Sequence, residues 1–394
     1  MKILLKKDYF LRSLGVHYVL LCLLTAIISV GVEAQTQHVK VVEFVPAPGQ
    51  FVNVLPQSGD GDSFNSLEMC DACTELLNNG GLVSLGSLGG YITVCFDHPV
   101  QNGRGSDLRI GGNAFYSSSA PLLDNGARGG SIEPGIVYVG VGSDLETCEW
   151  YELAGSEYYT SEVHDFQITY YRPSAEEGKA YLSGSSMDEY VRWHCTWTGS
   201  DGERRDSCGW HYKNSFHKQT YWPVWMNADS LTFLSGRLPN NGVDISENGT
   251  NWITYRYAPD SYGYVDASLK DDDYATFDLD WAVDRNGCPV QLDHCDFIRV
   301  QCSVFQQCGW IGETSTEVSL FQDLHLTKVK VNGKELPYDQ CPIVIAKRPL
   351  PASVLVPWQK HSFKDDIYYD IQGRRENYPQ RGRMYIHGGR KIYY

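Results

Sequence analysis

The sequence predicts an all-β protein: a jelly-roll-like β-sandwich with one short N-terminal helix and a small β module at the C-terminus. Two observations support this prediction. The 394 residues include 38 glycines and 13% aromatic residues, and only 21% are charged. Short β-branched and aromatic runs are separated by Gly, Asn, Asp and Pro, which is the pattern of strands joined by tight turns.

One segment, residues 63–77, has helical rather than strand periodicity. Four residues repeat there at helical spacing: Leu67, Cys70, Thr74 and Leu77. Gly80 follows where a C-terminal cap belongs, because glycine readily adopts the left-handed conformation that ends a helix. Within this helix, Cys70 and Cys73 have the spacing of redox and metal motifs. No βαβ context or second ligand pair accompanies them, so two buried or disulfide-bonded cysteines are expected instead.

Strands are predicted wherever apolar residues alternate or form short runs between turn residues. The expected strands are 39–44, 91–96, 108–110, 135–139, 166–171, 231–233, 252–257, 277–281 and 297–302. Within 329–336, Asn332-Gly333 predicts a hairpin with a two-residue turn. A proline-rich linker follows at 346–363 and separates the main domain, 35–345, from a tail at 364–394.

The N-terminus has the pattern of an export signal. Basic residues precede a short apolar run at 19–30, and Val32-Glu33-Ala34 fits a cleavage site, so residues 1–34 are expected to be a signal peptide. A lipoprotein anchor at Cys22 is the weaker alternative, because two leucines precede that cysteine. No other long apolar run occurs, so the mature chain is expected to have no transmembrane segment.

Eleven of the twelve cysteines follow the signal peptide. In an exported protein most of them should form disulfides, and an odd count leaves at least one thiol unpaired. Close spacing favours pairing Cys195 with Cys208 across a hairpin and Cys288 with Cys295 around a loop. A third candidate pair is Cys302 with Cys308.

The formal net charge of −15 argues against nucleic acid as a partner, because binding phosphates requires a basic face. Large aromatic residues and histidines crowd the stretch between residues 193 and 225. Aromatic rings stack on sugar faces or flat macrocycles, and Pro223 suggests a loop where they would be exposed. The residues expected to contact a ligand are Trp210, Tyr212, His217, Tyr221, Trp222 and Trp225. The alternative is that these rings fill the sandwich core.

Acidic residues suggest two further sites. On a strand at 277–281, Asp278 and Asp280 would share one face, and Asp284 follows nearby. These three carboxylates could hold a structural calcium ion, and the alternative is a solvated strand face. Paired carboxylates also cleave glycosides. The candidates for that role, near Trp150 and Tyr151, are Glu149, Glu152 and Glu157.

The tail resembles a known sorting signal. Residues 365–375 (DDIYYDIQGRR) and 382–391 (GRMYIHGGRK) are similar in both halves to the C-terminal sorting domain of type IX secretion substrates. This resemblance implies export through the periplasm to the cell surface or medium, and secretion machinery as a partner.

The main domain resembles a family of exported Bacteroidota cell-surface proteins, often called PKD-domain or simply cell-surface proteins. The segments that carry the resemblance are 46–53, 89–92, 96–100, 112–115, 133–137, 150–157, 216–219, 277–284 and 309–317. The family implies a galactose-binding-like sandwich and an association with nutrient capture, including cobalamin uptake. Relatives carry an acidic loop before the segment at 150–157, whereas residues 142–149 lack the alternating Asp/Asn oxygens of a calcium site.

The sequence therefore predicts a secreted or cell-surface protein that binds a glycan or a nutrient such as cobalamin without catalysing a reaction. A cell-surface uptake system is the expected partner. The alternatives are a glycan-cleaving enzyme and a structural or adhesive surface protein.

Overall fold

The computed structural model describes residues 37–58, 65–174, 189–213, 219–246, 248–309 and 311–326, together with the backbone of short strands beyond them. The chain falls into two compact units, Met1–Arg348 and Pro349–Tyr394. The expected linker, 346–363, lies outside the described residues.

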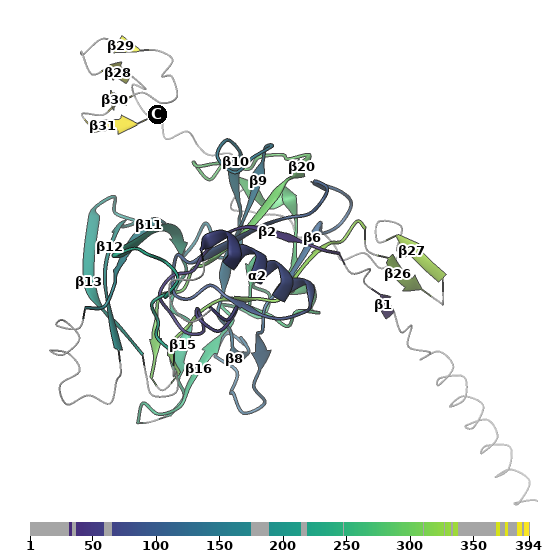
Figure 1. Ribbon diagram of the computed structural model, residues 1–394, viewed down its shortest axis with the longest axis horizontal. Coiled ribbons are helices and arrows are strands. Elements are labelled where there is room, and N and C mark those ends of the chain that lie inside the picture. Colours follow the sequence, from purple (N-terminus) through teal and green to yellow (C-terminus); the bar gives the residue numbers. More distant parts are fainter. Residues whose placement is uncertain are drawn as a thin grey trace, which may run out of the picture. The chain divides into compact units, whose positions relative to one another are not determined.

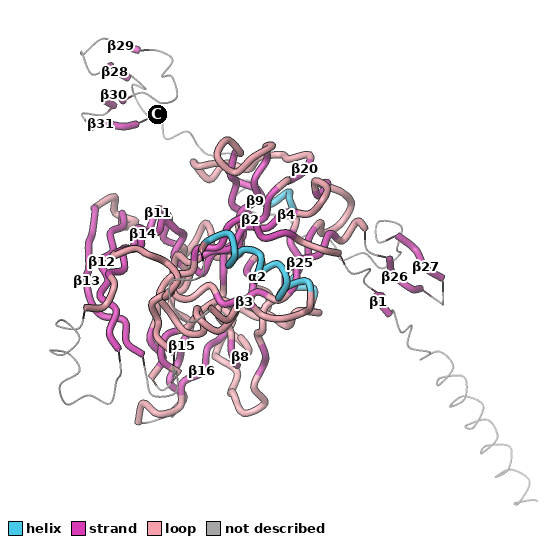
Figure 2. Tube along the Cα trace, viewed as in Figure 1, coloured by secondary structure: helices cyan, strands magenta, loops and turns pink. Residues whose placement is uncertain are grey.

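The prediction of an all-β protein is confirmed. Strands dominate the described residues, and every strand pairing among them is antiparallel; Figure 2 shows how little of the chain is helical. The strands form several sheets of modest size rather than one continuous layer.

The largest sheet has seven strands and lies at the centre of the first unit. Its order is β19-β10-β9-β21-β4-β2, and one further strand, β17, pairs with β9. The strands are β2 (Lys40–Val45), β4 (Tyr91–Cys95), β9 (Gly135–Val141), β10 (Glu149–Leu153), β17 (Tyr264–Val265), β19 (Ala282–Val283) and β21 (Phe297–Cys302). The branched side chains of Ile92, Val94, Ile298 and Val300 on adjoining strands are all buried, which explains why this region reads as apolar.

A second sheet has four long strands in the order β13-β12-β11-β14. They are β11 (Val163–Tyr171), β12 (Glu189–Thr198), β13 (Arg204–Lys213) and β14 (Ser230–Arg237). Its inner face covers a core that includes Phe166, Ile168, Tyr170 and Phe233. No strand was predicted at β12 or β13, although a hairpin was expected between Cys195 and Cys208 and residues 191–198 alternate apolar and polar side chains.

Smaller sheets complete the first unit. One has the order β15-β16-β8-β7, another β18-β6-β25, and three pairs join β20 to β5, β22 to β23 and β24 to β3. Their bounds are β3 (Val83–Ser84), β5 (Val100–Gln101), β6 (Leu108–Gly111), β7 (Phe115–Tyr116), β8 (Gly129–Ser131), β15 (Gly242–Asp244), β16 (Trp252–Tyr255), β18 (Thr276–Phe277), β20 (His294–Cys295), β22 (Gln307–Cys308), β23 (Gly312–Glu313), β24 (Glu317–Val318) and β25 (Leu320–Asp323).

The predicted helix is α2 (Ser66–Asn78), which lies across β2 in Figure 1. The Asn65 side chain caps it by accepting from the backbone amides of Leu67 and Glu68. The Glu68 carboxylate in turn accepts from the Asn65 backbone amide, which completes a capping box. Gly80 has a φ of 74° and bonds back to Leu77, as predicted for the C-terminus. The Asn78 side chain joins the helix to Val39, the residue just before β2. Its oxygen accepts from the Val39 amide, and its nitrogen donates to the Val39 carbonyl.

The buried face of α2 differs from the predicted one. Leu67 is 69% exposed, whereas Met69 and Cys73 are fully buried beside Cys70 and Leu77. The helix begins at Ser66, and the core lies along the Met69–Cys73 side. Cys70 and Cys73 are buried and unpaired, and burial raises the pKa of both thiols.

The prediction of one strand over 277–281 was wrong. The segment consists of β18, a 3₁₀ turn η2 (Leu279–Trp281) and then β19. Asp278 caps the turn by accepting a hydrogen bond from the Asp280 amide, and such local bonding by Asp competes with strand formation. A similar turn, η1 (Asp273–Ala275), is capped by Asp272 just before β18.

The predicted hairpin is confirmed: β26 (Lys328–Val331) pairs with β27 (Lys334–Pro337) around a two-residue connection. β1 (Gly31–Glu33), within the expected signal peptide, pairs with β26. The second unit contains β28 (Tyr368–Asp370), β29 (Arg375–Glu376), β30 (Met384–His387) and β31 (Arg390–Tyr393) in the order β29-β28-β30-β31.

Candidate functional site

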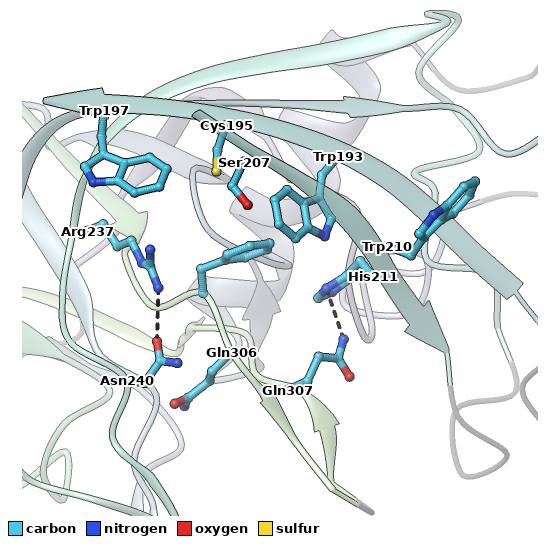
Figure 3. Close-up of a pocket in the computed structure, with 11 residues that line it drawn as sticks. Trp193, Cys195, Trp197, Ser207, Trp210, His211, Arg237, Asn240, Gln306 and Gln307 are labelled. Carbon is cyan, nitrogen blue, oxygen red and sulfur yellow. Dashed lines mark hydrogen bonds between the residues drawn. The ribbon is translucent and has the colours of Figure 1, made fainter. Parts of the chain in front are cut away.

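A pocket of about 320 Å³ opens beside the inner face of the four-stranded sheet (Figure 3). One wall is the strand pair β12–β13, and the segment 305–307 faces it. The end of β14 and the residues after it contribute Arg237 and Asn240. The described residues that line the pocket are Trp193, Cys195, Trp197, Ser207, Trp210, His211, Arg237, Asn240, Phe305, Gln306 and Gln307.

Strand alternation determines which side chains of β12 reach the pocket. Residues two apart on a strand share a face, so Trp193, Cys195 and Trp197 all point inward. In the register, Trp193 lies opposite Gly209 of β13. A Cβ on Gly209 would come within 2.6 Å of the Trp193 ring, so the glycine leaves room for the indole to lie over β13.

Aromatic rings form the apolar part of the pocket. Trp197 stacks on Phe166 with ring centroids 5.5 Å apart, and Trp193 meets the edge of Phe305 at 4.9 Å. Both indoles are half-buried. Each is therefore held in place by a core neighbour while part of its surface stays accessible to a ligand.

Polar groups lie across from the indoles. The Gln307 amide nitrogen donates to Nδ1 of His211 at 3.1 Å, while its buried Oε1 has no hydrogen-bond partner among the described residues. Turning the amide over would leave its nitrogen without a partner instead. Arg237 lies over the Phe166 ring at 5.2 Å, and its side chain makes a long contact of 3.5 Å with Asn240, which is exposed. These groups retain hydrogen-bonding capacity that a polar ligand could use.

His211 positions Gln307 and is not suited to acid–base chemistry. The imidazole is only 1% exposed, and burial lowers its pKa to about 3, so it stays neutral at physiological pH. Its Nε2 lies 3.9 Å from Oε1 of Glu313, which is also buried. Gln306 is likewise structural, because its amide oxygen accepts from the backbone of both Asn241 and Gly242.

The structure corrects half of the predicted ligand-binding residues. Tyr221, Trp222 and Trp225 are 0%, 3% and 7% exposed and belong to the core, where Trp225 stacks on Phe44. Pro223 does sit in a loop, as expected. However, Asn53 bonds the carbonyls of Thr220 and Trp222 and pulls that loop inward, so its rings cannot stack on a ligand.

The other predicted contacts are divided between two surfaces. Trp210 reaches the pocket rim, but it pairs with Arg192 on the outer face of the sheet, and its ring meets Tyr190 at 6.3 Å. Tyr212 lies on that outer face too, 6.0 Å from Tyr190. His217 lies outside the described residues. Of the lining residues, only Trp210 was predicted to contact a ligand, so the sequence missed Trp193, Trp197, Arg237 and Gln307 among others. Period-2 alternation along 189–198 was the signal available for the two tryptophans.

The predicted calcium site is not formed, because its three carboxylates serve separate turns. Asp278 is buried and caps η2, whereas Asp280 is exposed and accepts from the Asn102 side chain. Asp284 accepts from the backbone of Asn286 and Cys288. The carboxylate groups that do come together among the described residues lie elsewhere.

The predicted disulfides are also absent. Cys195 lies opposite Ser207, and Cys208 lies opposite His194, so the two thiols point to opposite faces of the hairpin. Cys195 is buried and Cys208 exposed; likewise Cys295 is buried and Cys288 exposed. Every described cysteine is a free thiol, including Cys302 and Cys308.

The carboxylates predicted for glycoside cleavage do not face one another. Glu149 is exposed and accepts from the Tyr151 hydroxyl, and Glu157 accepts from the Ser161 hydroxyl. Glu152 instead contacts Glu162, which the sequence did not single out. Burial raises the pKa of Glu162 to about 8. Two carboxyl groups in direct contact leave no space for a glycosidic bond, since glycosidase carboxyls are about 5 Å or more apart.

Among the described residues, no helix combines the length and the apolar character needed to cross a membrane. No protein-family model matches the chain, and no curated protein matches it significantly.

Proposed function

We propose that this protein binds a small carbohydrate in the β12–β13 pocket and does not cleave it. The observation that carries the proposal is the pairing of two half-buried indoles, Trp193 and Trp197, with the amide of Gln307, whose Oε1 has no partner in the part of the chain that the structure describes. A sugar ring has apolar C–H faces and a rim of hydroxyls. The indoles offer stacking surfaces, and the Gln307, Arg237 and Asn240 groups offer hydrogen bonds.

The size of the pocket favours a single sugar ring over a larger ligand. At about 320 Å³ it is at the small end of ligand pockets, which run from about 300 to 1,000 Å³. Cobalamin, whose macrocycle is much larger than one sugar ring, could lie only across the mouth. Cobalamin is therefore the second ligand to test.

Binding is favoured over cleavage because the described lining residues include no carboxylate. A glycosidase needs two of them beside the scissile bond. Adhesion is the remaining alternative; it would require no ligand in this pocket.

The signal peptide pattern and the sorting-like tail support export to the cell surface or medium. The proposal includes the galactose-binding-like, jelly-roll sandwich that the family resemblance implies, with secretion or uptake machinery as partner. Deleting residues 360–394 should prevent surface delivery and leave ligand binding intact.

Calorimetric titration of the mature chain, residues 35–394, with monosaccharides, disaccharides and cobalamin tests the proposal. Trp197→Ala and Gln307→Ala should each weaken sugar binding by roughly tenfold or more, as expected for central contacts. Tyr212→Ala is the matched control, because its ring lies on the outer face. A wild type that binds no sugar, or a Tyr212→Ala variant that loses as much affinity as Trp197→Ala, would overturn the proposal.

A further inference from the structure

A second chemically distinctive group lies outside the pocket lining. Glu152, Glu162 and His164 form the Glu–Glu–His cluster, in which one ligand atom from each residue lies within 4.8 Å of the other two. Glu152 is the fourth residue of β10, and the other two flank the first residue of β11. The cluster therefore joins β10, the strand next to edge strand β19 of the central sheet, to the start of the four-stranded sheet.

Local structure brings the three residues together. The residues before Glu162 fold into a turn in which its amide bonds back to the Glu157 carbonyl. The pairing of β11 with β14 is then irregular between Val163 and Phe166, and Asp165 there has a φ of 53°. This bulge directs His164 out of the regular alternation, and bulges commonly re-aim side chains at functional sites.

Glu162 lacks the donors that a buried carboxylate normally has. Its side chain is 0% exposed, and neither of its oxygens has a hydrogen-bond donor in the described part of the chain. The closest polar groups are the carboxyl of Glu152, within hydrogen-bonding reach, and Nδ1 of His164 at 3.4 Å. Two ionised carboxylates would repel one another strongly in a buried setting, so the pair is stable only when it shares a proton or binds a cation.

The neighbours of the cluster orient its members as ligands. Nε2 of His164 lies 3.0 Å from the Tyr158 carbonyl, which places the ring proton there and leaves the Nδ1 lone pair facing Glu162. Tyr138 donates to Glu152. Bonds of this kind, from the second ring nitrogen to a carbonyl and to a ligating carboxylate, are typical around protein metal ions.

We propose that Glu152, Glu162 and His164 bind a divalent transition-metal ion of the Zn²⁺ or Mn²⁺ type. Two carboxylates and an imidazole suit these ions, whereas Ca²⁺ prefers six to eight oxygens. Ligands at about 2.0–2.2 Å from one ion are up to about 4.4 Å apart, so the cluster needs to contract only slightly. His164 is 45% exposed, so the remaining coordination positions face solvent.

Titration of chelator-treated mature protein with Mn²⁺, Zn²⁺ and Ca²⁺ tests this site. The exposed thiols of Cys208 and Cys288 are alkylated first, because thiolates also bind Zn²⁺. One Mn²⁺ or Zn²⁺ ion should bind per chain, measured by calorimetry and by loss of the free Mn²⁺ electron paramagnetic resonance signal. Ca²⁺ should bind far more weakly.

Glu162→Gln and His164→Ala should each weaken Mn²⁺ binding by roughly tenfold or more, because each removes one of three ligands. Glu149→Gln, an exposed glutamate on the same strand, is the matched control and should match wild type. Circular dichroism establishes that each variant folds. The site is overturned if wild type binds neither ion, if Ca²⁺ binds equally well, or if Glu149→Gln weakens binding as much as Glu162→Gln. Sugar titration of the same variants distinguishes failure of the metal site from failure of the sugar pocket, because the pocket lining contains none of these residues.

Discussion

Two groups of carboxylates in this protein are both buried, yet they differ in how their oxygens are satisfied. The buried acidic cluster consists of Glu133, Asp266 and Glu317, which are 7%, 2% and 3% exposed. The Glu–Glu–His cluster contains two buried carboxyl groups beside a half-exposed histidine. Desolvation raises the pKa of the carboxyl groups in both.

In the buried acidic cluster, backbone amides and serine hydroxyls donate to the oxygens of Asp266 and Glu317. Asp266 accepts from the backbone amides of Asn113, Ala114 and Glu317 at 2.7–3.0 Å. Glu317 accepts from two serine hydroxyls. In the Glu–Glu–His cluster, Glu162 accepts from no described donor. Burial alone therefore does not identify a ligand site. The number of protein donors to a buried carboxylate distinguishes a structural acid from one available to a cation.

The largest expected effect comes from Asp266→Ala. It leaves the backbone amides of Asn113, Ala114 and Glu317 without their acceptor, the last two in buried positions, and places alanine at a φ of 59°. The free energy of unfolding should therefore fall by about 4 kcal/mol. Asp165→Ala is the control, because Asp165 is exposed at a φ of 53° and should show only the backbone cost of about 1 kcal/mol. Urea unfolding measures both. Similar losses in the two variants would mean that the hydrogen bonds of Asp266 contribute little.

The next largest effect is a pH dependence that originates at Glu317. Burial raises its pKa from 4.5 to about 7, and Glu133, Asp266 and Glu313 face it as further acids. The folded state then binds more protons than the unfolded state between these values. The stability contribution is complete below about pH 4.5 and is lost as pH rises through about 7, on the order of 3 kcal/mol.

Glu317→Gln isolates this contribution. Unfolding of wild type and variant is compared at several pH values, and their difference in stability should change across pH 4.5–7. A difference that stays constant would show that Glu317 titrates normally.

Glu162→Gln should have a smaller effect of opposite sign. Without metal, the amide replaces a carboxyl–carboxyl contact with a hydrogen bond to Glu152, so stability at pH 8 should rise by about 1 kcal/mol. Thermal unfolding in the presence of a chelator measures this, with Glu149→Gln as reference. A loss of stability would place Glu162 with the structural acids and remove the contrast between the clusters.

The smallest effect is expected from His164→Ala. The side chain is 45% exposed and packs on Tyr158 at 4.4 Å, so its removal should cost about 0.5 kcal/mol. The comparison variant is His211→Ala, whose imidazole is 1% exposed and bonded to Gln307; it should cost about 2–3 kcal/mol. If His164→Ala proves as costly as His211→Ala, His164 is a packing residue.

Much of the fold could be predicted because local pattern and structure agree. The apolar runs of β2, β4, β9 and β21 gave correct strands, and Gly80 and Asn332-Gly333 gave the helix end and hairpin. The two longest strands of the described residues, β12 and β13, were not predicted as strands, although residues 191–198 alternate apolar and polar side chains. The segment at 277–281 had the right alternation, but Asp278 uses its side chain to cap a turn.

The site was less predictable than the fold. The aromatic region was predicted as the binding surface, but the residues chosen within it were largely the wrong ones. Tyr221, Trp222 and Trp225 were expected at the surface, while Trp193 and Trp197 face the pocket. Which ring is exposed depends on the segments that cover it, here the inward-held loop bonded to Asn53.

The sequence by itself determined the strand-rich class, the helix α2 with its C-terminal Gly80, and the hairpin. These depend on neighbours a few residues apart. Only the tertiary structure decided which carboxylates meet, which cysteines remain apart and which indoles face a cavity. Glu133, Asp266 and Glu317 are far apart in the chain, and Cys195 and Cys208 are separated by one step of strand register. Such pairings depend on sheet packing and register, because a shift of one residue turns a side chain to the opposite face.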